Sequence, residues 1–198
     1  MGGGGTGTAL GGGAAAGPTY ADDVFSTFLY TGTGSGDITL NSGIDMAGEG
    51  GMVWAKNRDS SVYGGIFDSV RGANKRLRPD SNIQEATAAD ILKSFNSNGV
   101  TISADGGTLL NQNNDDYVAW MFRKARGFFD IVTYSGNSQS GRQIPHNLGS
   151  SPGMIIIKNL TNSSGADWAV WHKDGGQYEG KLNSNGSFGY EYVTGAND

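Results

Sequence analysis

The chain of 198 residues contains no cysteine, only 4 prolines and 17% charged residues. Without cysteine there are no disulfide bonds, no thiol redox chemistry and no thiolate metal ligands. No apolar run approaches the roughly 20 residues that a membrane-spanning helix needs. Lys and Arg number 14 against 19 Asp and Glu, which gives a formal charge of −5. Because phosphate and anionic lipid attract cationic surfaces, this balance argues against nucleic acid and membranes as partners.

Glycine and aromatic residues are abundant instead. The chain has 34 Gly, 8 Phe, 8 Tyr and 4 Trp. The aromatic residues stand in short apolar clusters between runs rich in Gly, Asn and Ser, a pattern typical of turn-rich all-β proteins. We therefore predict an all-β fold that buries these clusters.

The sequence also contains an internal repeat. FSTFLYTG at residues 25–32 recurs as FDIVTYSG at residues 129–136, which is 104 positions further on. GMVWAKN at residues 51–57 recurs as GMIIIKN at residues 153–159, which is 102 positions further on. Self-similarity at a nearly fixed spacing indicates tandem structural units.

The repeat divides the chain into three parts. We predict a Gly/Ala-rich N-terminal arm or anchor at residues 1–17, a first β-sandwich-like unit at 18–126 and a second, incomplete unit at 127–198. Gly-rich chains are flexible coils in isolation, so the arm is interpreted either as a disordered leader or as an anchor that orders against a partner. The second unit has no counterpart of YVAWMF at residues 117–122. A longer protein, a neighbouring chain or divergence would each explain this, and we expect the first.

The expected strands follow the apolar clusters. We predict strands at residues 24–30, 37–40, 52–55, 66–70, 100–102 and 117–122 of the first unit, and at 129–134, 154–158 and 168–171 of the second. Gly32–Gly36 is interpreted as a hairpin turn, and Asn98-Gly99 predicts a type I′ hairpin. Asn82 and Glu85 have the spacing of a capping box before an apolar stretch that ends at Phe95, which predicts one short helix.

No catalytic, cofactor-binding or metal-ligating motif is found. His146 and His172 lack a third ligand at metal-like spacing, and His146 is expected to donate to backbone carbonyls. Asn111, Asn113 and Asp115 alternate as in calcium loops but lack the glycine and the distal glutamate. Nothing in the sequence brings two carboxylates together for glycoside hydrolysis. We predict a protein that is not an enzyme, with no cofactor and no metal.

The candidate contact residues for a glycan or a partner are Trp168, Trp171, Arg71, Lys75 and Arg76. The basic residues are explained either by salt bridges and solubility or by contact with an acidic neighbour or an anionic glycan. The two tryptophans stand beside loops rich in Gly and Asn, which suggests a loop-rimmed surface. Trp54 and Trp120 lie inside apolar strands instead, so they are expected in the core.

Four segments carry a family resemblance: GMVWAKNRDSSVYGGIFDSVRGANKRL, LKSFNSNGVTIS, DDYVAWMFRKARGFFDIVTYSG and IPHNLGSSPGMIIIKN. They resemble a tail-fibre-like structural protein of tailed bacteriophages, common in phages of cyanobacteria and other aquatic bacteria. The resemblance spans roughly residues 50–172 and implies a virion component on the tail exterior, assembled in the host cytoplasm. Catalytic residues are not implied. The Gly/Ala tract matches no fibre-anchoring domain of such proteins.

The expected function is therefore that of a tail fibre or fibre-proximal subunit. By family analogy we expect a homo-oligomer, a trimer, that contacts tail or baseplate proteins through its N-terminal region and a host surface glycan through its distal part. Two alternatives stay open. A capsid decoration or cement protein would thread the Gly-rich arm along capsomers, and a glycan depolymerase would need paired carboxylates in a groove.

Overall fold

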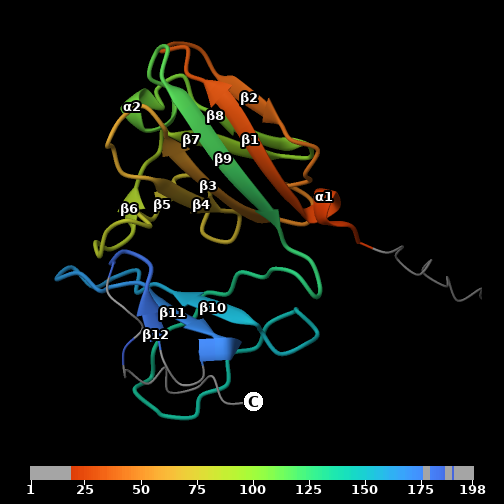
Figure 1. Cartoon of the computed structure of the whole chain (residues 1–198), viewed down its shortest axis with the longest axis vertical. Coiled ribbons are helices and arrows are strands. Elements are labelled where there is room, and N and C mark those ends of the chain that lie inside the picture. The colour runs from red at the N-terminus through yellow and green to blue at the C-terminus, as the bar shows by residue number, and fades with distance from the viewer. Residues whose placement is uncertain (1–18, 176–178, 186–188, 190–198) are drawn as a thin grey trace, which may run out of the picture.

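The structure is a computed structural model that describes residues 19–175, 179–185 and 189. The predicted N-terminal arm lies outside the described residues. Short antiparallel strands make up almost all of the regular structure (Figure 1), which confirms the all-β prediction. None of the described helices has the length and apolar character needed to cross a membrane. Residues up to Arg126 are called the first unit here, and those from Gly127 the second unit; these boundaries stay a prediction.

The first unit contains nine strands and two single-turn helices in the described chain. In chain order they are α1 (Ala21–Val24), β1 (Phe25–Thr31), β2 (Ile38–Asn41), β3 (Gly51–Asn57), β4 (Gly65–Asp68), β5 (Lys75–Arg76), β6 (Ala86–Thr87), β7 (Leu92–Asn96), β8 (Gly99–Ile102), α2 (Gly107–Leu110) and β9 (Asp116–Arg123). The second unit contains β10 (Met154–Ile157), β11 (Ala169–His172), the 3₁₀ turn η1 (Lys173–Gly175) and β12 (Glu179–Lys181).

Two sheets pack face to face in the first unit. One has the strand order β1-β9-β3-β4 and the other β2-β8-β7. Alternation along β3 turns Val53 and Ala55 to the inner face, where both are buried. The core between the sheets consists of Leu40, Ile44, Met46, Val53, Ala55, Phe67, Leu92, Val100, Ile102, Leu109, Leu110, Ala119 and Met121. Aligned packing of inner faces in this way is the β-sandwich arrangement.

Strand β9 occupies the centre of the larger sheet, as its nearly continuous apolar sequence predicts. Ala119 pairs with Phe28 of β1 on one side and with Ala55 of β3 on the other. Tyr30 of β1 stacks on Tyr117 of β9 with ring centroids 5.0 Å apart, and its hydroxyl donates to the Leu110 carbonyl at 2.9 Å. Burial raises the pKa of Tyr30, and Tyr117 raises it further. β9 therefore joins the two halves of the sheet, and its inward-facing residues Tyr117, Ala119 and Met121 are fully buried.

The hairpin β10-β11 of the second unit repeats the hairpin β3-β4 of the first. Met52 pairs with Asp68 in the first hairpin, and Met154 pairs with His172 in the second. The Asn57 side-chain oxygen accepts from the amides of Asp59 and Ser60. The counterpart Asn159 accepts in the same way from the amides two and three residues after it. The internal repeat is thus a repeat of structure, with equivalent strand pairing and the same hydrogen-bonded turn at the asparagine, although the second connecting loop is longer.

The predicted helix within residues 82–95 is wrong. Residues Leu92–Asn96 form β7, which pairs with β8 across a two-residue turn of Ser97 and Asn98. The hairpin beside Asn98-Gly99 is present, but the turn is not of the predicted type I′, because neither Ser97 nor Asn98 has a positive φ. Glu85, the expected capping residue, instead binds Arg71 at 3.0 Å. The hairpin signal of Asn-Gly and the pairing in the sheet therefore override the spacing of the capping box.

Two further expectations about turns and strands are corrected. β1 and β2, on either side of Gly32–Gly36, do not form a hairpin: β1 pairs with β9 and β2 pairs with β8. The turn carries the chain from one sheet to the other. Residues 129–134 do not form a strand either, because the only ladder contact there is the isolated bridge between Phe129 and Ala125.

Candidate interaction surface

The polar residues considered for metal or catalytic roles serve the structure locally. Among the residues that the structure describes, no group of three His, Cys, Asp or Glu could hold a metal ion. His146 does not donate to a carbonyl as expected, because its Nδ1 accepts from the Leu148 amide at 3.2 Å. His172 Nδ1 accepts from the Asp174 amide at 3.2 Å. Each imidazole ring therefore stabilises the turn that directly follows it in the chain.

The three residues compared with a calcium loop are not arranged as one. The Asn111 side chain is buried, and its oxygen accepts from the amides of Thr33 and Gly34. Its amide nitrogen donates to the carbonyl of Gly36 at 3.1 Å. Asn111 therefore uses its polar atoms to fix the 32–36 turn over the core.

Arg71 and Lys75, predicted as contact residues, belong to a network of ion pairs. Arg71 Nε lies 2.6 Å from Asp68 Oδ2, and both side chains are only 6% exposed. Glu85 binds Arg71 with one oxygen and Lys75 Nζ with the other, at 3.0 and 3.5 Å. Breaking a buried ion pair leaves an uncompensated charge. The geometry favours the salt-bridge interpretation for this pair of basic residues.

Arg76 lies on a neighbouring part of the surface and has a different environment. Burial lowers the pKa of Arg76, and the nearby charge of Arg78 lowers it further, while Asp80 opposes the change. The Arg78 guanidinium stacks over the Tyr63 ring at 4.5 Å from the centroid. Of the three basic residues proposed as contacts, Arg76 is therefore not part of the network around Arg71.

Trp168 lies inside the protein, at the junction of the two units, and not on a loop-rimmed surface. It is 4% exposed and packs with Ile66 and Leu77 of the first unit. Its indole nitrogen donates to the Arg78 carbonyl at 2.8 Å. The carbonyl of Asn82 also joins the units, because it accepts from the Ala166 amide and from Lys158 Nζ, both at 2.8 Å. Trp168 therefore attaches the second unit to the outer face of the larger sheet.

The other tryptophans are half-buried. Trp54 and Trp120 pair on the outer face of that sheet, with ring centroids 5.8 Å apart. Trp54 packs against the cluster around Trp168. It therefore lies at the edge of the junction between the units and not in the core, where it was expected. Trp171 is half-buried in β11. Of the two tryptophans proposed for contact, only Trp171 retains exposed surface.

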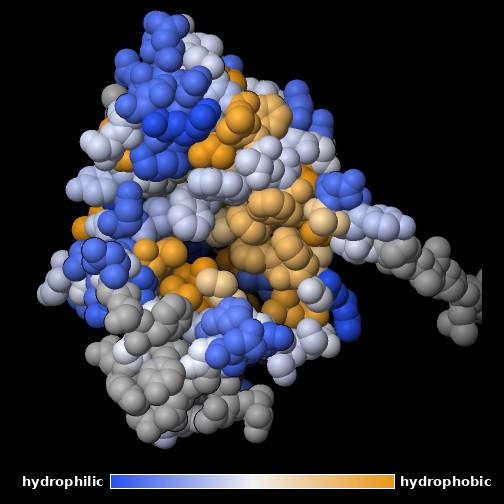
Figure 2. Space-filling model, viewed as in Figure 1, coloured by the Kyte–Doolittle hydropathy of each residue, from blue (hydrophilic) through white to orange (hydrophobic). Residues whose placement is uncertain are grey.

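An apolar patch extends from the first unit into the second. Phe122 at the end of β9 lies 4.9 Å from Phe25 and 5.5 Å from Phe129 between ring centroids. Phe128 is 42% exposed and Leu29 of β1 is 60% exposed. Figure 2 shows apolar side chains gathered over this part of β1 and β9 and the chain that follows. The junction is therefore apolar at the surface as well as inside.

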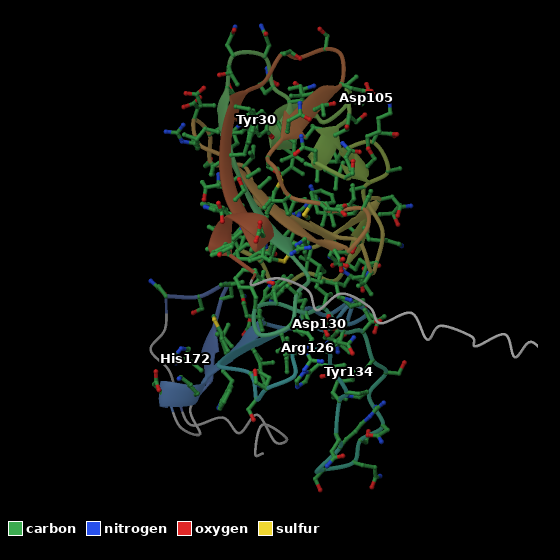
Figure 3. All side chains as sticks on the ribbon, turned by 90° about the vertical axis from the view of Figure 1, so that its right-hand side faces the viewer. Tyr30, Asp105, Arg126, Asp130, Tyr134 and His172 are labelled. Atoms are coloured by element: carbon green, nitrogen blue, oxygen red, sulfur yellow. The ribbon has the colours of Figure 1, made fainter. Side chains whose placement is uncertain are left out.

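Asp130 fixes the start of the second unit beside this patch (Figure 3). Its carboxylate is 6% exposed and lies 3.1 Å from Lys124 Nζ. It also accepts from the Asn147 amide at 2.8 Å. Burial raises the pKa of Asp130, but the bonds from Asn147 and Lys124 outweigh it and hold the pKa below its ordinary value.

The second unit exposes apolar side chains within residues 132–134 and on β10, and the sequence did not identify these residues individually. Val132 and Tyr134 are 41% and 48% exposed, and Met154 and Ile156 of β10 are 51% and 44% exposed. In the part of the chain that the structure describes, β10 pairs only with β11. The available signal was the missing counterpart of residues 117–122, which predicts unpaired neighbours.

The structure shows an all-β protein with a repeated hairpin and with exposed apolar side chains in its second unit. Residues 20–190 match the family described as "Domain of unknown function (DUF7483)", and the chain belongs to that family. Neither the curated proteins nor the solved structures contain a match to the chain.

Proposed function

We propose that the chain is a virion structural protein of a tailed bacteriophage, a tail fibre or fibre-proximal subunit. The observation that carries this proposal is the repeated hairpin, in which β3-β4 and β10-β11 have equivalent strand pairing and the same asparagine turn after the first strand. Modules repeated along a chain suit elongated assemblies, because each module contacts mainly its neighbours. The resemblance of the four segments to tail-fibre-like proteins supports the same assignment.

The proposal includes an assembly and a location. The subunit is a homotrimer on the tail exterior, assembled in the host cytoplasm, with its N-terminal region on a tail or baseplate protein. A distal part meets the host surface, where a glycan is the proposed ligand. Trp171 and Arg76 are the proposed contact residues, whereas the burial of Trp168 and the ion pairs of Arg71 and Lys75 favour structural roles.

Cryo-electron microscopy of the phage particle that carries this chain tests the proposal. The expected result is density for the first unit in a three-fold spike that leaves the tail. Copies over the capsid lattice would overturn the fibre assignment and establish the decoration protein. Absence of the chain from purified particles would overturn the virion assignment as a whole.

A quantitative count of copies per particle by mass spectrometry provides an independent check. A fibre follows the low-order symmetry of the tail, whereas a decoration protein follows the symmetry of the capsid. We therefore expect a copy number on the order of tens or fewer. A copy number in the hundreds would contradict the fibre assignment.

A further inference from the structure

We propose that Arg76 and Arg78, together with Tyr63 and Asp80, form a binding site for a sugar that carries a carboxylate, a uronic acid unit of a glycan. The inference deepens the proposed function, because it names the chemical class of the glycan, and it rests on that function for the source of the sugar. The site itself is argued from the contacts of these four residues in the first unit.

The two arginines flank Leu77 on an extended stretch of chain beside β4. The Leu77 amide donates to the Ile66 carbonyl at 3.0 Å, and its own carbonyl accepts from the Ile66 amide at 2.9 Å. The Leu77 side chain packs with the cluster at the junction of the two units. Because side chains alternate along an extended chain, the side chains of Arg76 and Arg78 both point away from that cluster.

The positive charges of the two arginines lie close enough to oppose each other. Burial lowers the pKa of Arg76, and the charge of Arg78 lowers it further. The Arg78 guanidinium is placed 4.5 Å from the centroid of the Tyr63 ring. Two adjacent cations create a local positive potential, which attracts an anion.

The described chain supplies no ion pair to either of these guanidinium groups. Glu85 binds both Arg71 and Lys75 nearby, whereas Arg76 and Arg78 form no salt bridge with any described residue. The Nε atoms of these two arginines are buried and have no acceptor among those residues. Buried donors in native proteins are nearly always satisfied by protein, water or a bound ion. Both residues are partly exposed, so an external carboxylate is the partner that we infer, through charge-assisted hydrogen bonds.

Tyr63 and Asp80 define the rest of the ligand. Tyr63 is 51% exposed although Arg78 covers one part of its ring, so the ring offers apolar surface to a sugar. Asp80 is exposed and close enough to Arg76 to act on its pKa. A carboxylate accepts hydrogen bonds from hydroxyl groups and repels additional negative charge. A sugar with one carboxylate therefore matches all four side chains, whereas inorganic phosphate matches the arginines alone.

The backbone around the site is fixed by the rest of the fold. The Arg78 carbonyl accepts from the Trp168 indole at 2.8 Å, and Arg76 pairs with Ala86 in the β5-β6 ladder. The Asp80 carboxylate accepts from the Gly64 amide at 3.1 Å. Groups that are already in place lose little conformational entropy when a ligand binds.

Isothermal titration calorimetry of the purified protein with trisaccharides of galacturonate, mannuronate and guluronate tests the site. We expect at least one acid to bind, and its affinity should fall as salt is added, because salt screens ionic contacts. The methyl ester of that trisaccharide has no charge and should not bind. Failure of all three acids, or equal binding of the ester, would overturn the proposal. Binding of inorganic phosphate without binding of any trisaccharide would establish a free-anion site and overturn the sugar ligand.

Arg76→Gln and Arg78→Gln are the test variants, and Arg142→Gln is the matched control. Arg142 lies 5.7 Å from the centroid of the Tyr134 ring, so the control removes the same charge from another pair of arginine and tyrosine. Each test variant should weaken binding of the trisaccharide by about tenfold or more, and the control should leave it unchanged. Circular dichroism checks folding. Equal weakening in all three variants would show an effect of overall charge and overturn the site.

Tyr63→Ala and Asp80→Ala test the contacts with the sugar ring and its hydroxyl groups. Both side chains are exposed, so these variants are expected to fold. Each should weaken binding of the trisaccharide by about threefold or more, and unchanged binding in both would overturn the sugar ligand. These experiments use the purified protein, so their failure would leave the location on the tail to be decided by microscopy of the particle. A capsid location would overturn the fibre assignment and leave the binding site standing.

Discussion

In the first unit, β3 lies between β4 and β9, and its inward-facing residues Val53 and Ala55 are buried. In the second unit, β10 pairs with β11 alone in the described chain, and the corresponding Ile155 and Ile157 are half-buried. The two hairpins share register and turn. The local sequence is therefore sufficient for the hairpin, whereas burial depends on neighbours that come from distant parts of the chain.

The two units differ in electrostatics as well. Asp68 and Arg71 form the buried ion pair after β4. In the second unit, the residues 104 positions further on are His172 and Gly175. The turn itself is kept, because His172 accepts from the Asp174 amide as Asp68 accepts from the Val70 amide. The second unit thus has the turn without the ion pairs that surround it in the first.

The largest expected effect comes from removing matched aromatic side chains. Phe67, which is fully buried, and Trp171, which is half-buried, occupy equivalent positions. Phe67→Ala should lower the free energy of unfolding by about 3–5 kcal/mol, because it leaves a cavity in the core. Trp171→Ala should lower it by about 1–2 kcal/mol. Urea denaturation followed by circular dichroism measures both, and equal losses would contradict the comparison.

Arg71→Ala tests the buried ion pair of Asp68 and Arg71, which has no counterpart at the equivalent positions of the second unit, His172 and Gly175. The change leaves the Asp68 carboxylate buried without its partner, so the free energy of unfolding should fall by about 3–5 kcal/mol. Lys75→Ala, at a side chain that is 37% exposed, is the control and should cost less than about 1 kcal/mol. If the Arg71→Ala variant keeps its stability but loses binding to a partner, Arg71 is a contact residue and not a structural one.

Trp168→Phe tests the attachment of the second unit to the first. The phenyl ring keeps the apolar contact with Ile66 but loses the indole donor to the Arg78 carbonyl. The loss of this hydrogen bond should cost about 1 kcal/mol. We expect faster hydrogen exchange in β10 and β11 with little change in β1 and β9. Trp54→Phe is the matched control, and faster exchange of β10 in that variant to the same extent would argue against the hydrogen bond as the cause.

The smallest effect is expected for Asp130→Asn and depends on pH. The pKa of Asp130 is lowered in the folded protein, so its carboxylate contributes stability that is present above the unfolded pKa of about 3.9. This contribution is lost as pH falls through the lower, folded pKa. The wild type should therefore melt at a higher temperature than the variant at neutral pH, and the difference should shrink below about pH 4. A difference that is independent of pH would contradict the ionic origin.

Strand prediction from the sequence succeeded where pattern and pairing agree. The central strand β9 was predicted from its apolar sequence, and the β7-β8 hairpin from Asn98-Gly99, although its turn residues are Ser97 and Asn98. It failed at residues 129–134, which have the alternation of a strand but no partner in the described chain to pair with. It also failed at Glu85, whose capping-box spacing could not reveal an ion pair with Arg71 fourteen positions away.

The exposure of the predicted contact residues also depends on residues that are distant in the sequence. Trp168 stands beside a glycine-containing loop, and this neighbourhood suggested exposure. Its burial is decided by Ile66 and Leu77, about a hundred residues earlier in the chain. The exposed Met154 and Ile156 lie in an apolar segment that the sequence alone would place in a core. Burial is a property of the packed neighbours, so the composition of a segment does not determine it.

Local sequence specifies the β class, the repeat and the asparagine turns that follow β3 and β10, because alternation of apolar residues and the Lys-Asn ends of these strands act over a few residues. Long-range packing determines which strands share a sheet and which tryptophan is buried. These depend on pairing between residues far apart in the chain. In the first unit β9 makes that pairing, whereas in the second unit β10 pairs with β11 alone among the described residues.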